Sequence, residues 1–274
     1  MPRVSVISGA YNIEGVFSFH KSMESILTGE LEDFEFIICD DGSSDKTWEL
    51  LSEYAKRDAR IVLLKNEENK GLAFSLNRCI EIAKGEYIAR HDLDDYSHKE
   101  RLKKQIDYLD KNKDVSLLGT QAYLFDKNGV WGKEHFPVKV TKRDFLFTSP
   151  YQHGAVVFRR EALVSAGGYR VAKETMRAED YDLFMTMHMT QKGENLDEFL
   201  YYFCEDDSSK KRRKYRYRIG EMKVRFRGFK RLGLMPRGFF YAIKPLIVGL
   251  IPPSLLDRLK KKRARREILE ESDE

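Results

Sequence analysis

A chain of 274 residues with 42% hydrophobic and 12% aromatic residues has enough apolar material for a globular core, which excludes a disordered or fibrous protein. Its net charge of +5 is unevenly spread, because residues 208–274 carry 21 Lys and Arg against 7 Asp and Glu, which leaves 28 against 37 in the rest. Three cysteines, Cys39, Cys79 and Cys204, are too few and too scattered for a disulfide framework or a zinc site, so we interpret them as buried reduced thiols of a cytosolic protein.

Residues 3–90 alternate predicted strands with predicted helices. Short apolar runs predict the strands, and helical spacing of apolar residues predicts the helices between them. In chain order these are a strand at 3–8, a helix at 16–27, a strand at 34–39, a helix at 47–54, a strand at 61–64, a helix at 71–83 and a strand at 87–90. The first residues lack the apolar core of a signal peptide, so we expect them to open the first strand. This alternation predicts an α/β fold with a Rossmann-like, mostly parallel sheet flanked by helices.

The pattern is less regular after residue 95. In chain order we expect a helix at 99–112, a strand at 116–122, a hairpin turn at 126–129, a strand at 155–158, a short helix at 161–166, a turn at 167–169 and a helix at 179–189. From residue 210 the composition becomes basic and aromatic. We therefore divide the chain into a globular domain at 1–207, a basic amphipathic segment with helical character at 208–266 and an acidic, disordered tail at 267–274.

Two of the predicted strands end in clusters of aspartates. Asp40 and Asp41 follow the strand at 34–39, and Asp92, Asp94 and Asp95 follow the strand at 87–90. Ligands of parallel α/β sheets bind at the carboxyl ends of the strands. Closely spaced carboxylates repel one another unless a cation neutralises them, and Mg²⁺ or Mn²⁺ prefers one or two carboxylates together with phosphate oxygens. The clusters are therefore candidates for binding a metal and a nucleotide diphosphate.

Both clusters also have a plain structural interpretation. An acidic turn can simply cap the helix that follows it, and Asp95 or Ser97 would be the N-cap in the second cluster. A functional aspartate at the first cluster would accept hydrogen bonds from a base or a ribose hydroxyl. Lys70 precedes a predicted helix whose free N–H groups would suit a phosphate.

Four motifs in order resemble those of family 2 glycosyltransferases with the GT-A fold, of the bacterial surface-polysaccharide type. They are Val4-Ser5-Val6-Ile7 with Tyr11-Asn12, Asp40-Asp41-Gly42-Ser43-Ser44-Asp45, Asn69-Lys70-Gly71-Leu72-Ala73, and Gly85-Glu86-Tyr87-Ile88-Ala89-Arg90 leading into Asp92-Leu93-Asp94-Asp95. His153-Gly154-Ala155-Val156-Val157-Phe158-Arg159-Arg160-Glu161, Gly167-Gly168-Tyr169 and Glu179-Asp180-Tyr181-Asp182-Leu183 are similar to the acceptor half of that family. The resemblance covers about residues 3–190 and implies a donor half at about 1–130 and an acceptor half at about 131–207.

The resemblance also implies roles for residues of the donor half. Asp41, with Asp40 beside it, would bind the base and ribose of the donor. Asp92 and Asp94 would be the Asp-X-Asp pair that holds a divalent metal, Mn²⁺ or Mg²⁺, on the diphosphate. Asp95 would contact the sugar or position its neighbours. The remaining donor contacts would come from Gly9, Tyr11 and Lys70, and Gly9 offers only its backbone.

In the acceptor half, the resemblance assigns the general base of an inverting transfer to Asp180, the aspartate of the Glu179-Asp180 pair. Glu179 and His153 are further candidates on the acceptor side. His153 would line the acceptor pocket or bind metal, and a structural histidine is an equal alternative. His91 is interpreted as structural.

Residues 210–237 hold thirteen Lys or Arg and one acid, Glu221, interleaved with aromatic residues. This pattern is compatible with a solvated basic helix or with nucleic-acid binding, although the acidic body argues against a nucleic-acid-binding protein. The tract at 239–251 is apolar but broken by Lys244 and Pro245, and it is too short to span a bilayer. We therefore favour peripheral contact with an anionic membrane surface.

Together these features predict an inverting glycosyltransferase of cell-surface polysaccharide synthesis. It would move a sugar from a nucleotide-diphosphate donor, a UDP-sugar, to a hydroxyl of a glycan or lipid-linked acceptor, at the inner face of the cell membrane. The alternatives are a nucleic-acid-binding protein that uses the basic tail and a nucleotidyltransferase of similar fold. That enzyme would need a Gly-rich, basic phosphate loop after the first strand, and Ser8-Gly9-Ala10-Tyr11-Asn12 is not one.

Overall fold

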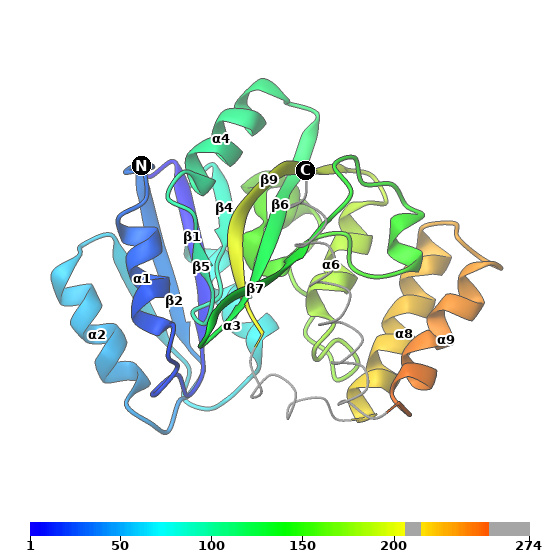
Figure 1. Cartoon of the computed structure of the whole chain (residues 1–274), viewed down its shortest axis with the longest axis horizontal. Helices are drawn as coiled ribbons and strands as arrows, with labels where there is room; N and C mark the ends of the chain where they lie inside the picture. The colour runs from blue at the N-terminus through cyan, green and yellow to red at the C-terminus, as the bar shows by residue number, and fades with distance from the viewer. Residues whose placement is uncertain (206–214, 252–274) are drawn as a thin grey trace.

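The computed structural model describes residues 1–205 and 215–251, and these residues are built around one mixed sheet (Figure 1). The strand order is β3-β2-β1-β4-β8-β6-β9-β5, and β7 pairs with β6 at one side. The strands are β1 (Val4–Ala10), β2 (Phe34–Asp40), β3 (Ile61–Lys65), β4 (Tyr87–Arg90), β5 (Tyr96–Ser97), β6 (Val115–Asp126), β7 (Gly129–Glu134), β8 (Val157–Arg159) and β9 (Lys192–Cys204). β1 to β4 are parallel, β6 and β9 are parallel to each other, and β5, β7 and β8 run antiparallel to their neighbours. The predicted mostly parallel sheet is confirmed.

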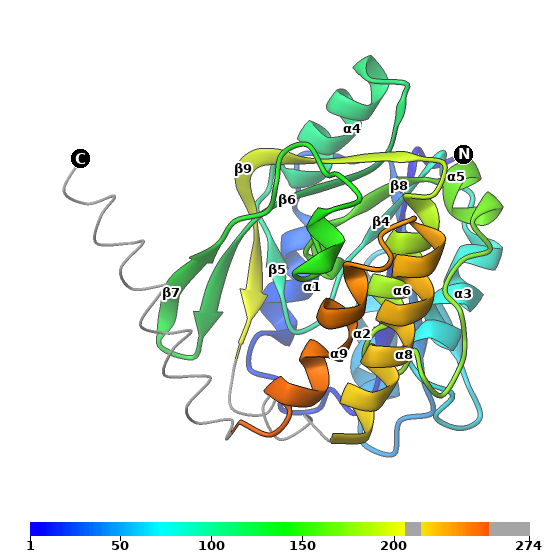
Figure 2. The ribbon, with the colours of Figure 1, turned by 90° about the vertical axis from the view of Figure 1, so that its right-hand side faces the viewer.

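Helices cover both faces of this sheet (Figures 1 and 2). They are α1 (Phe19–Leu27), α2 (Thr47–Arg57), α3 (Leu72–Ile82), α4 (Arg101–Lys111), α5 (Arg160–Ser165), α6 (Glu179–Met187), α8 (Tyr215–Arg231) and α9 (Gly238–Val248), with 3₁₀ turns η1 (Asp144–Leu146) and η2 (His153–Ala155). None of the helices in the described parts of the chain is long and apolar enough to cross a membrane.

Alternate residues of the central strands enter two cores on opposite faces of the sheet. Val4 and Val6 of β1 pack with residues of α1, α2 and α4, whereas Ile7 packs with residues of α3, α6 and α8. Successive side chains of a strand point to opposite faces, so a sheet covered on both sides needs apolar residues at nearly every position. That requirement explains why these strands appear in the sequence as nearly continuous apolar runs.

The described part of the basic segment packs on the globular body. Val224 and Phe229 of α8 and Ala242 of α9 belong to the same core as α6. A Cβ on Gly228 would lie 2.2 Å from the sulfur of Met185, so the glycine leaves room for this side chain between α8 and α6. Residues 215–251 are therefore part of the folded body in this structure, while 206–214 and 252–274, including the tail at 267–274, lie outside the described residues.

The main element that sequence patterns did not predict is β9. Its first half, Lys-Gly-Glu-Asn-Leu-Asp-Glu, has no apolar alternation. The strand exists because it pairs in parallel with β6 over most of its length and also pairs with β5. The predicted hairpin at 126–129 is confirmed as the β6–β7 turn, and all three cysteines are buried and free.

Candidate active site

Strand order places the two aspartate clusters at one edge of the sheet. β1 lies between β2 and β4, and Ala10 is in register with Asp40 while Ile7 is in register with Arg90. Chain segments that follow these three strands therefore meet at the same carboxyl edge. A Cβ on Gly9 would lie 2.7 Å from the Cδ1 of Leu72, so the glycine also permits close packing of β1 on α3.

The carboxylate of Asp41 organises the loop before α3. It accepts hydrogen bonds from Asn66 Nδ2 at 2.7 Å, from the N–H of Lys70 at 2.9 Å and from the N–H of Gly71 at 2.8 Å. The Gly71 N–H, one of the groups that were expected to suit a phosphate, is therefore already used by Asp41. The Lys70 ammonium pairs with Glu68, and Tyr11 is half-exposed.

Asp40 lies beside this loop and is fully buried. Its Oδ1 accepts a hydrogen bond from the N–H of Ser43 at 3.0 Å, and its Oδ2 has no partner among the described residues. Gly42 has a φ of +67°, and a Cβ there would lie 2.5 Å from the carbonyl carbon of Glu68. Burying an unpaired carboxylate oxygen is costly, so a donor group at Asp40 Oδ2 would be stabilising.

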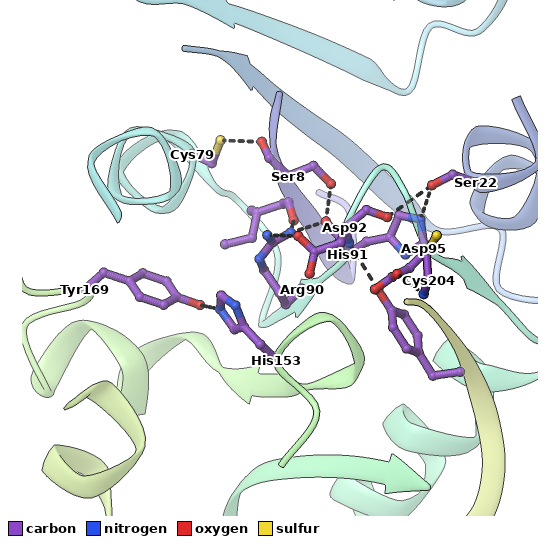
Figure 3. Close-up of polar contacts among 12 residues, drawn as sticks. Ser8, Ser22, Cys79, Arg90, His91, Asp92, Asp95, His153, Tyr169 and Cys204 are labelled. Carbon is purple, nitrogen blue, oxygen red and sulfur yellow. Dashed lines mark hydrogen bonds and ion pairs between the residues drawn. The ribbon is translucent and has the colours of Figure 1, made fainter. Parts of the chain in front are cut away.

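The turn after β4 combines acidic groups with a buried arginine (Figure 3). The guanidinium of Arg90 pairs with Asp92 and donates to the carbonyls of Ile7 and His91, while its Nε has no partner among the described residues. The fully buried Asp95 accepts a hydrogen bond from the N–H of Cys204 at 2.7 Å, and its Oδ2 has no described partner. Burial, with the charges of Asp94 and Asp92, raises the pKa of Asp95 well above its usual range.

Asp95 and Ser97 are not helix caps in this structure. The N-cap position of α4 is Glu100, which makes no side-chain capping bond. Ser97 Oγ instead accepts a hydrogen bond from Arg101 Nε at 2.8 Å. The capping interpretation of the second cluster is therefore wrong, because pairing between β5 and β9 places this turn against the end of β9.

The structural interpretation of His91 agrees with its surroundings. Its imidazole is fully buried, and Nε2 lies 2.9 Å from Ser22 Oγ. Burial and the nearby Arg101 and Arg90 charges lower its pKa well below the usual range, so the ring is neutral at physiological pH.

Residues of β9 and η2 lie against Asp92. The N–H of Asp92 donates to the hydroxyl of Tyr201 at 3.2 Å. A Cβ on Gly154 would lie 2.0 Å from that hydroxyl and 2.9 Å from Asp92 Oδ2, so only glycine fits there. Arg90 and Tyr201 were not predicted as site residues. Arg90 is part of the fourth quoted motif, whereas Tyr201 lies on β9, which the sequence pattern did not predict.

The donor set suits a hard divalent cation with few protein ligands. The described residues contain no group of three or more His, Cys, Asp or Glu arranged to hold a metal ion. Mg²⁺ and Mn²⁺ in nucleotide sites need only one or two carboxylates, because phosphate oxygens supply the rest. The Asp92 and Asp94 carboxylates fit that requirement, although Asp92 already shares one oxygen with Arg90.

Asp180 is the second residue of α6 and is more than half buried. Burial of its carboxyl raises its pKa to about 7, with further contributions from the charges of Glu179 and Asp92. Burial likewise raises the pKa of Glu179. The charge of Asp92 thus acts on Asp180, so the Glu-Asp pair of the acceptor half lies within electrostatic range of a donor-half aspartate. A carboxyl with such a pKa is suited to general-base catalysis near neutral pH.

His153 stands between these halves. Its Nε2 lies 2.8 Å from the hydroxyl of Tyr169 (Figure 3). Burial, together with the charge of Arg90, lowers the pKa of the imidazole to about 3, so the ring is neutral. The backbone of Tyr169 exchanges two hydrogen bonds with the amide of Asn77 on α3, at 2.7 and 2.9 Å. Asn77 and Tyr169 therefore connect the two halves. The sequence analysis quoted Tyr169 in a motif but gave it no role.

Comparison with known proteins agrees with these features. The family model for glycosyl transferase family 2 matches residues 5–172. The putative glycosyltransferase EpsE of Bacillus subtilis (strain 168) is 38% identical over 264 residues, which cover 96% of this chain and 94% of EpsE. The Escherichia coli UDP-Glc:alpha-D-GlcNAc-diphosphoundecaprenol beta-1,3-glucosyltransferase WfaP is 38% identical over 113 residues, 41% of this chain and 43% of WfaP.

Solved structures with the same fold include two complexes with nucleotide sugars. S. aureus TarS 1-349 in complex with UDP-GlcNAc has a TM-score of 0.67 at 20% identity and covers 91% of this chain and 72% of its own. Mannosyltransferase PcManGT from Pyrobaculum calidifontis, in complex with GDP-Man and Mn²⁺, has a TM-score of 0.63 at 16% identity and covers 96% and 80%. At these identities the likeness concerns the fold, and it confirms the GT-A type.

Proposed function

This chain belongs to glycosyl transferase family 2, and on that basis we propose that it transfers a sugar from a nucleotide-diphosphate donor to an acceptor hydroxyl with inversion at the anomeric carbon. The observation that carries the proposal has two parts: Asp40 and Asp41 meet the turn at 90–95 at one edge of the sheet, and the charge of Asp92 in that turn acts on the carboxyl of Asp180. A single displacement needs a site for the leaving diphosphate and a base for the attacking hydroxyl. We propose that these residues supply both.

On the donor side, Asp40 and Asp41 are proposed to bind the base and ribose. Asp40 Oδ2 is buried and has no described partner, so it is ready to accept a hydrogen bond from the nucleoside. Tyr11, Gly9 and Lys70 lie on the segments around this end and are proposed as further donor contacts. A UDP-sugar is the proposed donor, in keeping with the UDP-GlcNAc bound to TarS.

Asp94 and Asp92 are proposed to hold Mn²⁺ or Mg²⁺, in keeping with the Mn²⁺ in the PcManGT complex. The cation, when bound, would neutralise charge that develops on the departing diphosphate. Arg90 places a fixed positive charge against Asp92. The buried Asp95 is proposed to position the turn rather than bind the cation, because its Oδ1 accepts a hydrogen bond from the N–H of Cys204.

On the acceptor side, Asp180 is proposed to take the proton of the attacking hydroxyl, a contribution of about 10²- to 10⁴-fold. Glu179 raises the pKa of Asp180, and neutral His153 is proposed to contact the acceptor. A lipid-linked sugar is the proposed acceptor, since WfaP is named for a diphosphoundecaprenol substrate. Such an acceptor would place the enzyme at the inner face of the cell membrane, where the basic segment at 208–266 favours an anionic surface.

The test is a screen of UDP- and GDP-sugars with Mn²⁺, measuring thermal stabilisation and release of the nucleoside diphosphate. We expect one donor class to stabilise the protein only when metal is present. We further expect Asp180→Asn to keep that stabilisation and lose transfer. If no nucleotide sugar stabilises the protein or is consumed, the proposed donor site is wrong.

A further inference from the structure

α9 presents large apolar side chains to solvent and small ones to the body. Each helical residue advances the direction by about 100°, so positions 239, 240, 243, 246, 247 and 250 share one face. On that face Phe240 is 78% exposed, Ile247 61% and Leu250, in the turn that follows the helix, 75%. The buried residues of α9 are Gly238, Ala242 and Pro245. A surface helix of a globular protein normally has the reverse arrangement.

Exposed apolar side chains are concentrated on this helix pair. Residues 215–251 hold seven of the eighteen exposed large hydrophobic residues in the described chain, although they are only 37 of its 242 described residues. The two helices lie side by side (Figure 2). The ring of Phe226 on α8 contacts that of Phe239 on α9 edge-on, with the ring centroids 5.7 Å apart. Isolated exposed hydrophobics need no explanation, but a contiguous group of this kind marks an interaction surface.

The charge around the apolar face indicates which partner fits. Residues 215–251 contain nine Lys and Arg but one acid, Glu221, which already pairs with Arg218 and Arg225. Arg227, Lys230 and Lys244 are exposed. Two copies of the chain joined through this face would bring their positive charges together, which is unfavourable. An anionic bilayer surface would instead accept the apolar side chains and neutralise the cations.

We propose that the outer face of α9, formed by Phe239, Phe240, Ile243, Leu246, Ile247 and Leu250, inserts into the interfacial region of an anionic lipid leaflet. The exposed basic residues of α8 and Lys244 lie at the level of the headgroups. This inference rests on the proposed function insofar as a lipid-linked acceptor explains why the enzyme works at a membrane. The inference specifies which side of the molecule faces the membrane. It also attributes attachment to insertion of apolar side chains as well as to charge.

Flotation of the full chain with vesicles tests this proposal without donor or acceptor, so the result is independent of the proposed function. The vesicles are pure phosphatidylcholine or phosphatidylcholine with a quarter phosphatidylglycerol. The variant is Phe240→Ser with Leu250→Ser, and the matched control is Val164→Ser with Val130→Ser, whose side chains are 54% and 49% exposed elsewhere. We expect the variant to partition at least ten-fold more weakly into anionic vesicles, and the control to partition like the original chain.

Insertion is read directly with Phe240→Trp. Its added fluorescence should shift to the blue with anionic vesicles and be quenched by brominated lipid chains, whereas Val164→Trp should show neither effect. Circular dichroism melting verifies that each variant is folded. Equal flotation of variant and control, or an unquenched signal from Phe240→Trp, would overturn the proposal. A dimer in vesicle-free solution that Phe240→Ser with Leu250→Ser dissociates would overturn it in favour of a second copy.

Discussion

The exchange of Asp180 for Asn tests whether the acceptor half supplies the base. Folding raises the pKa of this carboxyl from its ordinary value of 3.8 to about 7. At about 1.36 kcal/mol per pKa unit, the charged form is disfavoured by about 4 kcal/mol relative to the unfolded chain. Asn has nearly the same shape but carries no charge and cannot accept the proton. The exchange should therefore change catalysis and stability in opposite directions.

The catalytic effect is measured as donor turnover between pH 5 and 9 with saturating Mn²⁺. The original enzyme should gain kcat/KM as pH rises, with a midpoint near 7, because the base must lose its proton first. Asp180→Asn should abolish this rise and lower kcat by about 10²-fold or more, while Mn²⁺-dependent stabilisation by UDP is nearly kept. Glu179→Gln is the matched variant. It removes the second-largest cause of the raised pKa, so the midpoint should move to lower pH.

The stability effect has a definite sign. Because the folded-state pKa is raised, the folded protein binds more protons than the unfolded chain between about pH 4 and pH 7, and stability falls as pH rises through that interval. Asp180→Asn should therefore be more stable than the original chain at pH 8, by at most about 4 kcal/mol, and equal to it below about pH 4. Urea unfolding at both pH values measures this difference. Full activity of Asp180→Asn, or a variant no more stable at pH 8, would refute the reasoning.

Three further substitutions follow from the site. Asp94→Ala should abolish Mn²⁺-dependent thermal stabilisation by UDP. The control Asp107→Ala, at an exposed aspartate of α4, should keep it. An unchanged response of Asp94→Ala would show that Asp94 does not bind the metal. Gly42→Ala should cost about 1–3 kcal/mol of stability and weaken UDP binding, because its φ is +67° and a Cβ would strike the Glu68 backbone. The control Gly129→Ala, with positive φ but open space, should leave UDP binding intact. Tyr169→Phe removes the 2.8 Å contact between the Tyr169 hydroxyl and His153 Nε2. It should lower kcat by the same factor at every pH from 6 to 9, because His153 stays neutral over that range. A loss confined to donor binding would contradict the proposed role of His153 on the acceptor side.

Sequence patterns predicted most of the donor half because its signals are local. The alternation of apolar runs and helical spacing identified β1 to β4 and the helices between them, and the aspartates stand directly at the strand ends. The convergence of Asp40 and Asp92 followed from the parallel arrangement alone. β9 was not predicted, because its residues carry no period of their own and its burial comes from pairing with β6 and β5.

By itself, the sequence determined the family, the fold class and which carboxylates were candidates, since these depend on residue type and on spacing within short segments. Only the tertiary structure decided what each carboxylate contacts. Asp41 accepts hydrogen bonds from the N–H groups of Lys70 and Gly71, and Asp92 pairs with Arg90. The pKa of Asp180 is raised by burial and by the charges of Glu179 and Asp92. It also decided that α8 and α9 pack on the body and which apolar face they leave exposed. These outcomes depend on contacts between residues far apart in the chain and on how much water each group loses, and no local pattern encodes either quantity.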